Sequence, residues 1–389
     1  MAAYDVLVQV PEAPINETLT WGTDTIVADD GTVTTASYLQ LPKRSWKGNF
    51  SFDTEADLRY HLAASFRKFK GLFNFPLRHM GVIAKAKIAI GASVIYCNTA
   101  RTDFRAGMSV FIWSSSTFET KIIDEVNADN ITLTTVTTNA YYRGYVCPVV
   151  EVYSANMAST VRRPINSQAT ASFNFFQNGF QSPFLNPEDE VALAAYDGLP
   201  LLNRRGFGAE FGQALDTGLE VADYGGVPAF RSRWLAPQKA KTLLFKSPRT
   251  FDPDDWKFWL SFFDYCLGST NPFYLPTWRD DVEVFAVPAS GGNQITLQGH
   301  EYLDHYWPVA AYHNFVVTKP DGTQHFATAS AIANVAGNDR LTFAPAVPAG
   351  DWSGSSFSFL LKCRIDDDTV AIEHRGGNSV VTLNLRTTD

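Results

Sequence analysis

An internal repeat constrains the fold of this chain more than any other feature of its sequence. The tetrapeptide SFDT at residues 51–54 is matched by TFDP at residues 250–253, at an offset of 199 (252 − 53). Pro76 is matched by Pro276 at an offset of 200 (276 − 76). The further matches, in the same order along the chain, are VADDG and VADYG at 27–31 and 221–225, TV at 160–161 and 369–370, and SFNF and TLNL at 172–175 and 382–385. A repeat of this length predicts a duplicated domain rather than a solenoid of short units.

The pattern between the matched segments predicts a mainly β chain with a few short helices. Short runs of alternating or β-branched residues are separated by turns, as in a small barrel or sandwich. We expect two similar β-domain halves, residues 1–190 and 191–389, joined by a loop-rich linker. Each half is predicted to carry one aromatic helix and one inserted small β-barrel or sandwich, at about residues 84–153 and 285–363. The expected strands are 4–10, 32–41, 87–97, 109–113, 118–126, 130–135, 146–153 and 159–176 in the first half, and 227–235, 294–298, 314–319, 325–332, 340–343, 356–364 and 369–385 in the second.

Each predicted helix begins at an aspartate and carries stripes of large apolar residues. Asp53 and Asp252 are expected as N-caps, because a carboxylate accepts hydrogen bonds from the free amides of the first turn. The stripes are Leu58, Leu62, Phe66, Phe69 and Phe73 in the first helix, and Trp256, Trp259 and Phe263 with Phe258, Phe262 and Tyr265 in the second. A helix that is aromatic on most of its circumference must be buried on more than one side, which predicts contact with a neighbouring domain or subunit.

Composition excludes several classes of function. Charged residues make up 19% of the 389 residues and aromatic residues 14%, which is typical of an ordered globular chain. The net charge of −8 argues against a general nucleic-acid surface. Four widely separated cysteines suggest buried free thiols in a reducing cytoplasm, and neither a signal peptide nor a membrane segment is expected.

Candidate reactive groups form no known catalytic or metal-binding pattern. A histidine cluster in the second half has spacings that fit no ligand motif, and the first half has no equivalents. Its members are His300, His305, His313 and His325, with Asp304 beside them. Acidic runs at 188–190, 280–281 and 366–368 would serve a glycosidase only if two carboxyls faced each other across a sugar. We therefore expect no enzyme activity, no cofactor, and no catalytic, cofactor-binding or metal-binding residue.

The segment at residues 251–281 resembles a signature of the tail-tip proteins of long-tailed bacteriophages. Its sequence, FDPDDWKFWLSFFDYCLGSTNPFYLPTWRDD, joins a capped aromatic helix to a Pro-Phe-aromatic-Leu-Pro-Thr-Trp turn and an acidic start to the next strand. Residues 123–148 resemble the β-module inserted in the same proteins. The counterpart turn in the first half, FNFPLR at 73–78, lacks the tryptophan.

The resemblance implies a structural virion protein of a siphovirus-like phage, assembled in the host cytoplasm and located at the tail tip. Such a distal tail protein or baseplate hub component would form a ring that joins the tail tube to the tip hub or fibre. Its partners would be the tail tube protein and other tail-tip proteins. Three copies with two similar domains each would make a pseudo-hexameric ring, which bridges a sixfold tube and a threefold fibre, and a homohexamer is the other expectation. The expected interface or structural residues are Trp256, Trp259, Phe263, Phe273, Tyr274, Pro276, Trp278, Phe66, Phe69 and Phe73.

Two other interpretations stay open at this stage. The first is a carbohydrate-binding or glycan-degrading protein that acts at the host surface, with Trp307, Trp352 or Tyr302 as stacking platforms. The second is a cellular two-domain β-protein that is monomeric. Glycan binding would favour the first, and failure to assemble would favour the second.

Overall fold

The computed structural model describes residues 6–8, 10–27, 33–52, 54–67, 71–114, 117–154, 162–165, 168–179, 191–206, 213–216, 219–224, 227–232, 238–247 and 253–388. The elements of the first half are β1 (Pro11–Thr20), β2 (Thr23–Val27), β3 (Val33–Ser37), β4 (Lys43–Phe52), α1 (Glu55–Arg67), β5 (Phe73–Pro76), the short helical turn η2 (Arg78–Met80), β6 (Val82–Ile83), β7 (Val94–Tyr96), the turn η3 (Thr99–Arg101), β8 (Ser109–Ser114), β9 (Thr117–Asn127), β10 (Asn130–Leu133), β11 (Tyr145–Ser154), β12 (Arg162–Ile165) and β13 (Gln168–Gln177).

The second half contains the other helix and the remaining strands. Its elements are β14 (Ala195–Tyr196), β15 (Leu199–Pro200), β16 (Gln213–Asp216), β17 (Leu219–Tyr224), β18 (Val227–Ser232), β19 (Gln238–Ser247), α2 (Pro253–Cys266), β20 (Phe273–Pro276), β21 (Val284–Ala286), β22 (Gln294–Leu297), the turns η5 (Tyr302–Tyr306) and η6 (Ala310–Tyr312), β23 (Asn314–Thr318), β24 (Gln324–Val335), β25 (Asn338–Ala344), β26 (Ser356–Ile365), β27 (Thr369–Arg375) and β28 (Asn378–Thr387).

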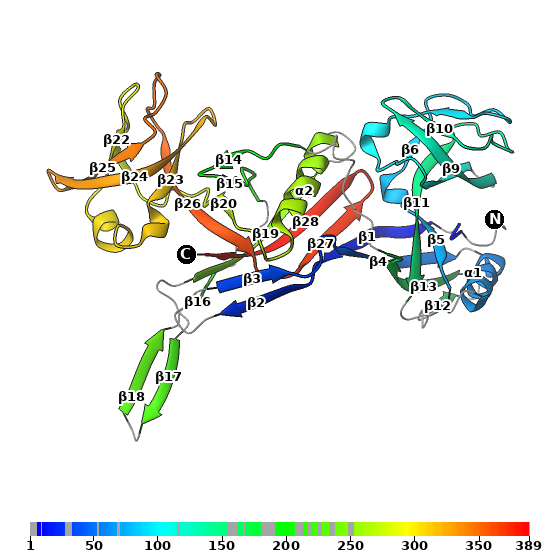
Figure 1. Cartoon of the computed structure of the whole chain (residues 1–389), viewed down its shortest axis with the longest axis horizontal. Helices are drawn as coiled ribbons and strands as arrows, with labels where there is room; N and C mark the ends of the chain where they lie inside the picture. Colours follow the sequence, from blue (N-terminus) through cyan, green and yellow to red (C-terminus); the bar gives the residue numbers. More distant parts are fainter. Residues whose placement is uncertain are drawn as a thin grey trace.

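The strands form a mainly β structure, as the sequence predicts. One hydrogen-bonded network joins 22 of the described strands, and its ladders are antiparallel. In Figure 1 the strands of the 84–153 region lie at one end of the molecule and β22 to β25 lie at the other. Between them β1, β27, β28 and β19 lie close together, and α2 covers this central sheet.

Each half joins its helix to the same kind of strand arrangement. In the first half β4 precedes α1 and pairs with β13, while β5 follows α1 and pairs with β11. In the second half β19 precedes α2 and pairs with β28, while β20 follows α2 and pairs with β26. In both halves the third ladder, β11 with β13 or β26 with β28, closes the set.

The first predicted strand is wrong in its position. Within residues 4–10 the described part forms one isolated bridge, between Val6 and Asn74, and the long strand is β1 at Pro11–Thr20. β1 includes two prolines, Pro11 and Pro14. It is a strand because β4 and β27 pair with its two edges, and β27 lies more than 340 residues away in the chain.

The helix starts follow the prediction only in part. In α1 the cap within the described residues is Thr54, whose Oγ1 accepts a 3.1 Å hydrogen bond from the amide of Asp57. The Asp57 carboxylate in turn accepts from the Thr54 hydroxyl at 2.6 Å, which is a reciprocal cap at the positive end of the helix. In α2 Pro253 takes the first helical position, where its missing N–H costs nothing. Asp53 and Asp252 lie outside the described residues.

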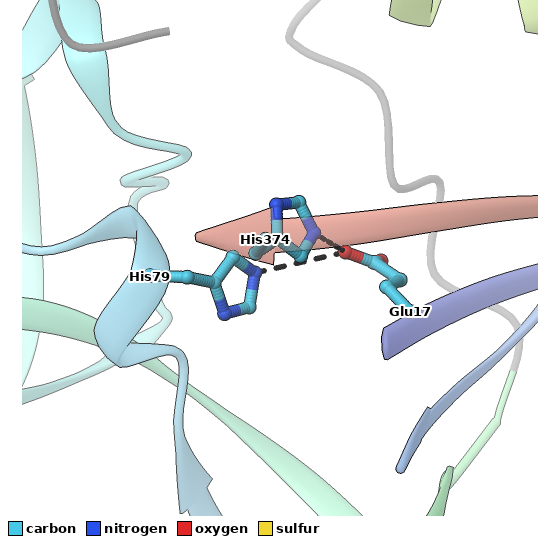
Figure 2. Close-up of side chains that lie close together, drawn as sticks. All are labelled: Glu17, His79 and His374. Atoms are coloured by element: carbon cyan, nitrogen blue, oxygen red, sulfur yellow. Dashed lines mark hydrogen bonds and ion pairs between the residues drawn. The ribbon is translucent and has the colours of Figure 1, made fainter. Parts of the chain in front are cut away.

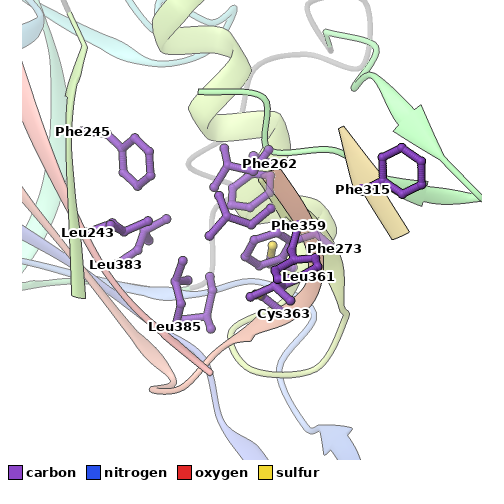
Figure 3. Close-up of a cluster of buried hydrophobic side chains, with 14 of the residues drawn as sticks. Leu243, Phe245, Phe262, Phe273, Phe315, Phe359, Leu361, Cys363, Leu383 and Leu385 are labelled. Carbon is purple, nitrogen blue, oxygen red and sulfur yellow. The ribbon is translucent and has the colours of Figure 1, made fainter. Parts of the chain in front are cut away.

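The largest hydrophobic core surrounds α2. Trp259 packs on Phe245 of β19 with ring centroids 4.8 Å apart, and Phe262 packs on Phe273 of β20 at the same separation. Figure 3 shows how side chains of β19, β20, β26 and β28 converge beneath the helix. Burying one such aromatic side chain contributes about 1.5–3 kcal/mol, so this face of α2 anchors the second half. A separate core in the first half lies among β4, β5, β11 and β13.

Candidate functional site: the junction between the halves

Strand β1 belongs to the first half of the sequence but pairs with strands of both halves. On one edge it pairs with β4, where Glu17 lies opposite Trp46. On its other edge it pairs with β27 over six residues, from Ile15 opposite His374 to Thr20 opposite Thr369. The central sheet therefore runs without interruption from one half to the other.

The chain that follows β1 continues onto the second half. Trp21 is 2% exposed and lies in the core of α2, although the rest of that core comes mainly from the second half. Its amide donates to the Asp368 carbonyl at 2.9 Å. The hairpin of β2 and β3 adds two hydrogen bonds, from the Thr23 amide to Asp368 Oδ2 (2.7 Å) and from Thr35 Oγ1 to the Thr270 carbonyl (3.1 Å). Strand pairing, an apolar anchor and a docked hairpin thus hold the two halves together.

A buried cluster of ionisable side chains lies beside the β1–β27 ladder. Glu17 of β1 accepts from Arg44 of β4 (Nε to Oε1, 2.7 Å) and lies 2.9 Å, Oε2 to Nε2, from His374 of β27. His79 of η2 lies 3.6 Å, Nε2 to Oε2, from the same carboxylate. Figure 2 shows the two imidazoles on one side of Glu17, reached from the two halves of the chain. The side chains of all four residues are at most 4% exposed.

The electrostatics of this cluster favour an ionised Glu17. Burial alone would raise the pKa of its carboxyl, but Arg44, His374 and His79 together hold that pKa well below its usual range. The Nε2–H tautomer of His374 donates to Glu17, and its Nδ1 then accepts from the Ser379 hydroxyl at 2.8 Å. The buried carboxylate of Glu17 is thus paired with Arg44 and close to His374, and such pairing is the condition for a buried charge to be tolerated.

The cluster also has the composition of a metal site, and its geometry speaks against that use. Among the described residues, Glu17, His79 and His374 are the group whose ligand atoms lie within 4.8 Å of one another. Their two imidazoles, however, are stacked with centroids 4.1 Å apart and planes inclined by 19°. An ion bound by an imidazole lies near the ring plane, along the nitrogen lone pair. Two nearly parallel rings at this separation cannot both meet a zinc ion at ~2.1 Å. Arg44 would also repel a cation from the carboxylate.

Metal removal should therefore leave the protein unchanged. We expect the same melting temperature, within about 1 °C, after dialysis against EDTA and after addition of equimolar zinc, because no ligand set is pre-formed. Differential scanning fluorimetry with and without each additive would measure this. A stabilisation by zinc that disappears in H374A, with the EDTA-treated protein as reference, would contradict the ion-pair interpretation.

The residues expected at interfaces or in structural positions lie mostly inside this chain. Buried among residues of the same chain are Trp256, Trp259, Phe263, Phe273, Tyr274, Pro276 and Phe73. Trp278 is half-buried with a positive φ of 57°. The side chain of Phe66 and all of Phe69 lie outside the described part of the structure. The buried ones among them pack within one copy of the chain.

The turn after α2, at residues 271–281, anchors β26. The Asp280 carboxylate accepts from the Phe357 amide at 3.1 Å, and Asp281 accepts from the Phe359 amide at 2.8 Å. The Thr277 amide donates to the Phe359 carbonyl at 2.9 Å. The acidic pair thus binds backbone amides of the neighbouring strand. Its role is to hold the strand in place.

The other candidate reactive residues are dispersed. His300, His313 and His325 each contact a different group: Asp339 Oδ1 (3.1 Å), the Trp307 carbonyl (2.9 Å) and the Pro345 carbonyl (2.8 Å), respectively. Asp366, Asp367 and Asp368 bind Arg386, Asn384 and the Thr23 amide. The acidic run at 188–190 lies outside the described residues.

The proposed glycan platforms are wrong in two of three cases. Tyr302 and Trp352 are at most 2% exposed, so neither can stack on a sugar from solvent. Trp307 is half-buried and stacks on His313 with centroids 4.2 Å apart.

The four cysteines are free and buried, as the sequence suggested. Burial raises the pKa of the Cys147 thiol to about 12 and that of Cys97 to about 11, so neither is a reactive thiolate at neutral pH.

The junction cluster has no counterpart among the sites that the sequence predicts. Its four residues come from segments that no motif connects. The available signal was Glu17 itself, which occupies an inward position between Ile15 and Leu19 in an alternating strand. A charge at such a position is expected to have a buried partner.

Comparisons with known proteins do not assign this chain to a family. A scan with protein-family models finds no match to this chain, and a search of curated proteins finds none either. In the described part of the chain, no helix has the length and apolar character needed to span a bilayer.

Proposed function

We propose that this chain carries two related β-domains and is a structural component of a ring at the distal end of a phage tail tube, where it joins the tube to the tip hub or fibre. The observation that supports this best is the agreement in strand register between the two halves. A duplicated domain within one chain supplies two similar subunit faces, which is what a pseudo-hexameric ring of three copies requires.

The first support is equality of strand lengths. β4 and β19 have 10 residues each, as do β11 and β26, and β13 and β28, while β5 and β20 have four. Each first-half strand also pairs with its neighbours in the same way as its second-half counterpart. The four pairs of counterpart strands around the two helices thus agree both in length and in pairing.

The second support is that the registers agree residue for residue. β4 and β19 are offset by 195 (238 − 43), and β13 and β28 by 210 (378 − 168). Phe50 and Ala171 lie opposite each other in the first half. When these offsets are added to their residue numbers, they give Phe245 and Val381, which lie opposite each other in the second half. Offsets of 200 (273 − 73) and 211 (356 − 145) likewise convert Phe75–Val150 into Leu275–Leu361. A one-residue slip would turn every side chain to the other face of the sheet, so the agreement supports descent from one domain.

The third support is the junction. The β1–β27 ladder places the two domains side by side in one sheet, as adjacent positions of a ring with a continuous wall would be. The resemblance of residues 251–281 to phage tail-tip proteins supplies the biological setting.

Assembly is the direct test. We expect purified protein, at rising concentration or with tail tube protein added, to form rings with a central hole whose mass by light scattering is three or six chains. Negative-stain images of the same sample would choose between the pseudo-hexameric trimer and the homohexamer. A chain that remains a monomer under all these conditions would refute the ring. Glycan binding by the same monomer would then favour the host-surface alternative, which loses Tyr302 and Trp352 as platforms but is otherwise open to this test.

A further inference from the structure

The two strands that form the β1–β27 junction have counterparts elsewhere in the same chain, and these counterparts do not pair with each other in the described structure. In the first half β1 leads into β4, and in the second half β16 leads into β19. Thr18 of β1 lies opposite Ser45, and Ala214 of β16 lies opposite Ala240. The partners Ser45 and Ala240 are related by the β4-to-β19 offset of 195 (240 − 45), so Ala214 occupies the position of Thr18. Both strands also end at equivalent places, Thr20 and Asp216.

Strand β27, which pairs with β1, also has a counterpart in the first half. β27 pairs with β28, with Arg375 opposite Asn378, and β12 pairs with β13, with Ile165 opposite Gln168. The partners Asn378 and Gln168 differ by the β13-to-β28 offset of 210 (378 − 168). β12 is therefore the first-half equivalent of β27.

The two counterparts have free edges where β1 and β27 are joined. Among the described strands β16 pairs with β19 alone and β12 pairs with β13 alone. β1 and β27 each have two partners, because they pair with one another. An edge strand presents a row of backbone N–H and C=O groups that can pair with another chain, and assembled proteins cover such edges.

The hairpins that follow β1 and β16 differ in the same way: the first docks on another part of the chain and the second extends away from it. The β2–β3 hairpin follows β1 and docks on the second half through Thr23 and Thr35. The β17–β18 hairpin follows β16 and, within the described part of the chain, pairs with no other strand. Figure 1 shows it extending away from the rest of the molecule. The β17–β18 hairpin is therefore positioned to dock on a second copy, as the β2–β3 hairpin docks on the second half of its own chain.

From this we infer the contact between copies: β16 of one chain adds antiparallel to β12 of the next, and the β17–β18 hairpin docks over that neighbour's first half. The inference rests on the proposed duplication and ring, and it specifies which edges meet. The contact is head-to-tail, since the second half of one copy meets the first half of another, and such an interface generates a ring when the rotation between successive copies closes. Junctions within and between chains then alternate around one continuous sheet.

Hydrogen exchange on the assembled protein tests the inference. Peptides covering residues 162–165 and 213–216 are expected to exchange about tenfold or more slowly in the ring than in the single chain at a concentration below assembly, because every second amide gains a partner. Peptides from β1 and β27 are the internal control, and they should be protected equally in both states. Rings in which 162–165 and 213–216 exchange as fast as in the single chain would overturn the inference while leaving the ring intact.

Proline substitutions give an independent measure. Successive amides of a strand point to opposite edges, so one of A214P and L215P removes a donor on the free edge of β16 and the other removes one toward β19. We expect one of the two to remain folded, with an unchanged circular dichroism spectrum, and to stay a single chain by light scattering. The matched control is A286P, in the exposed edge strand β21, which should still form rings. If every folded proline variant assembles, the β16 edge is not the contact. If the unmodified protein never assembles, the proposed ring itself has failed.

Discussion

Replacing Glu17 by glutamine is expected to destabilise the protein by about 3–5 kcal/mol, the usual cost of removing one partner from a buried ion pair. Glu17 is 2% exposed and Arg44 is 4% exposed, so solvent does not compensate the guanidinium once its carboxylate is gone. Glutamine keeps a single acceptor oxygen, so it can accept from Arg44 or from His374 but not from both. Urea unfolding of E17Q beside the unmodified protein, at pH 7, measures the difference.

An exposed glutamate provides the control. Glu125 in β9 is exposed, and E125Q should change the free energy of unfolding by less than about 0.5 kcal/mol. A loss below about 1 kcal/mol in E17Q would mean that the cluster contributes little to the junction. Rescue by E17Q/R44M, which removes the stranded charge as well, would identify that charge as the source of the loss.

The stabilities of the unmodified protein and of E17Q should also respond differently to acid. The folded-state pKa of Glu17 is depressed, so its stabilisation is fully present above its unfolded pKa of about 4.3 and is lost as the pH falls toward the folded value. Asp103 is buried nearby, and burial raises its pKa, which acts in the opposite sense. Glu17 is only the smallest cause of the Asp103 shift, so the difference in stability between the unmodified protein and E17Q should still shrink as the pH falls below about 4.3. A difference that is constant from pH 7 to pH 3 would contradict this assignment.

Replacing Trp21 by alanine should cost about 3–5 kcal/mol, the range measured for large aromatic side chains deleted from cores. Trp21 is 2% exposed within the core of α2. Its Cβ lies 3.0 Å from the Cβ that a side chain at Gly268 would have, so the surroundings fit this residue closely. Gly268 has a positive φ of 70°, a backbone conformation that suits glycine at this close approach to Trp21. Urea unfolding measures the loss.

An exposed aromatic residue is the matched control for Trp21. Phe285 is 60% exposed, and F285A should be close to neutral. W21F should fall between W21A and the unmodified protein, since it restores part of the buried volume. A W21A protein as stable as F285A would show that the first half does not depend on this anchor.

The sequence predicts the local elements of this fold and misses its long-range ones. The alternation in 146–153 and 356–364 identified β11 and β26 to within one or two residues, because inward and outward positions differ in polarity along each strand. The strand expected at 87–97 shrinks to β7, Val94–Tyr96, since the residues before it contribute only one isolated bridge, between Ile88 and Tyr141. The aromatic stripe of α2 correctly indicated burial on several sides, although pattern alone could not identify the covering strands.

The junction was beyond local sequence reasoning for a physical reason. Pairing of β1 with β27, and the meeting of Glu17 with His374, depend on contacts across the length of the chain. Nothing in the sequence around Pro11 and Pro14 specifies that partner. The histidines that looked clustered in the sequence are dispersed, whereas His79 and His374, 295 residues apart (374 − 79), stack on one another.

The large sequence separation between β1 and β27 also determines when their pairing can form during biosynthesis. The Thr23–Asp368 hydrogen bond links residues 345 positions apart, so β1 has no partner on that edge while the ribosome is still translating the second half. Chains of this size emerge over tens of seconds, at about 5–20 residues per second, and Leu19 and Trp21 stay uncovered during that time. Nascent chains would therefore need protection from one another until translation nears its end. A chain cut short before β27 would keep an open edge at β1.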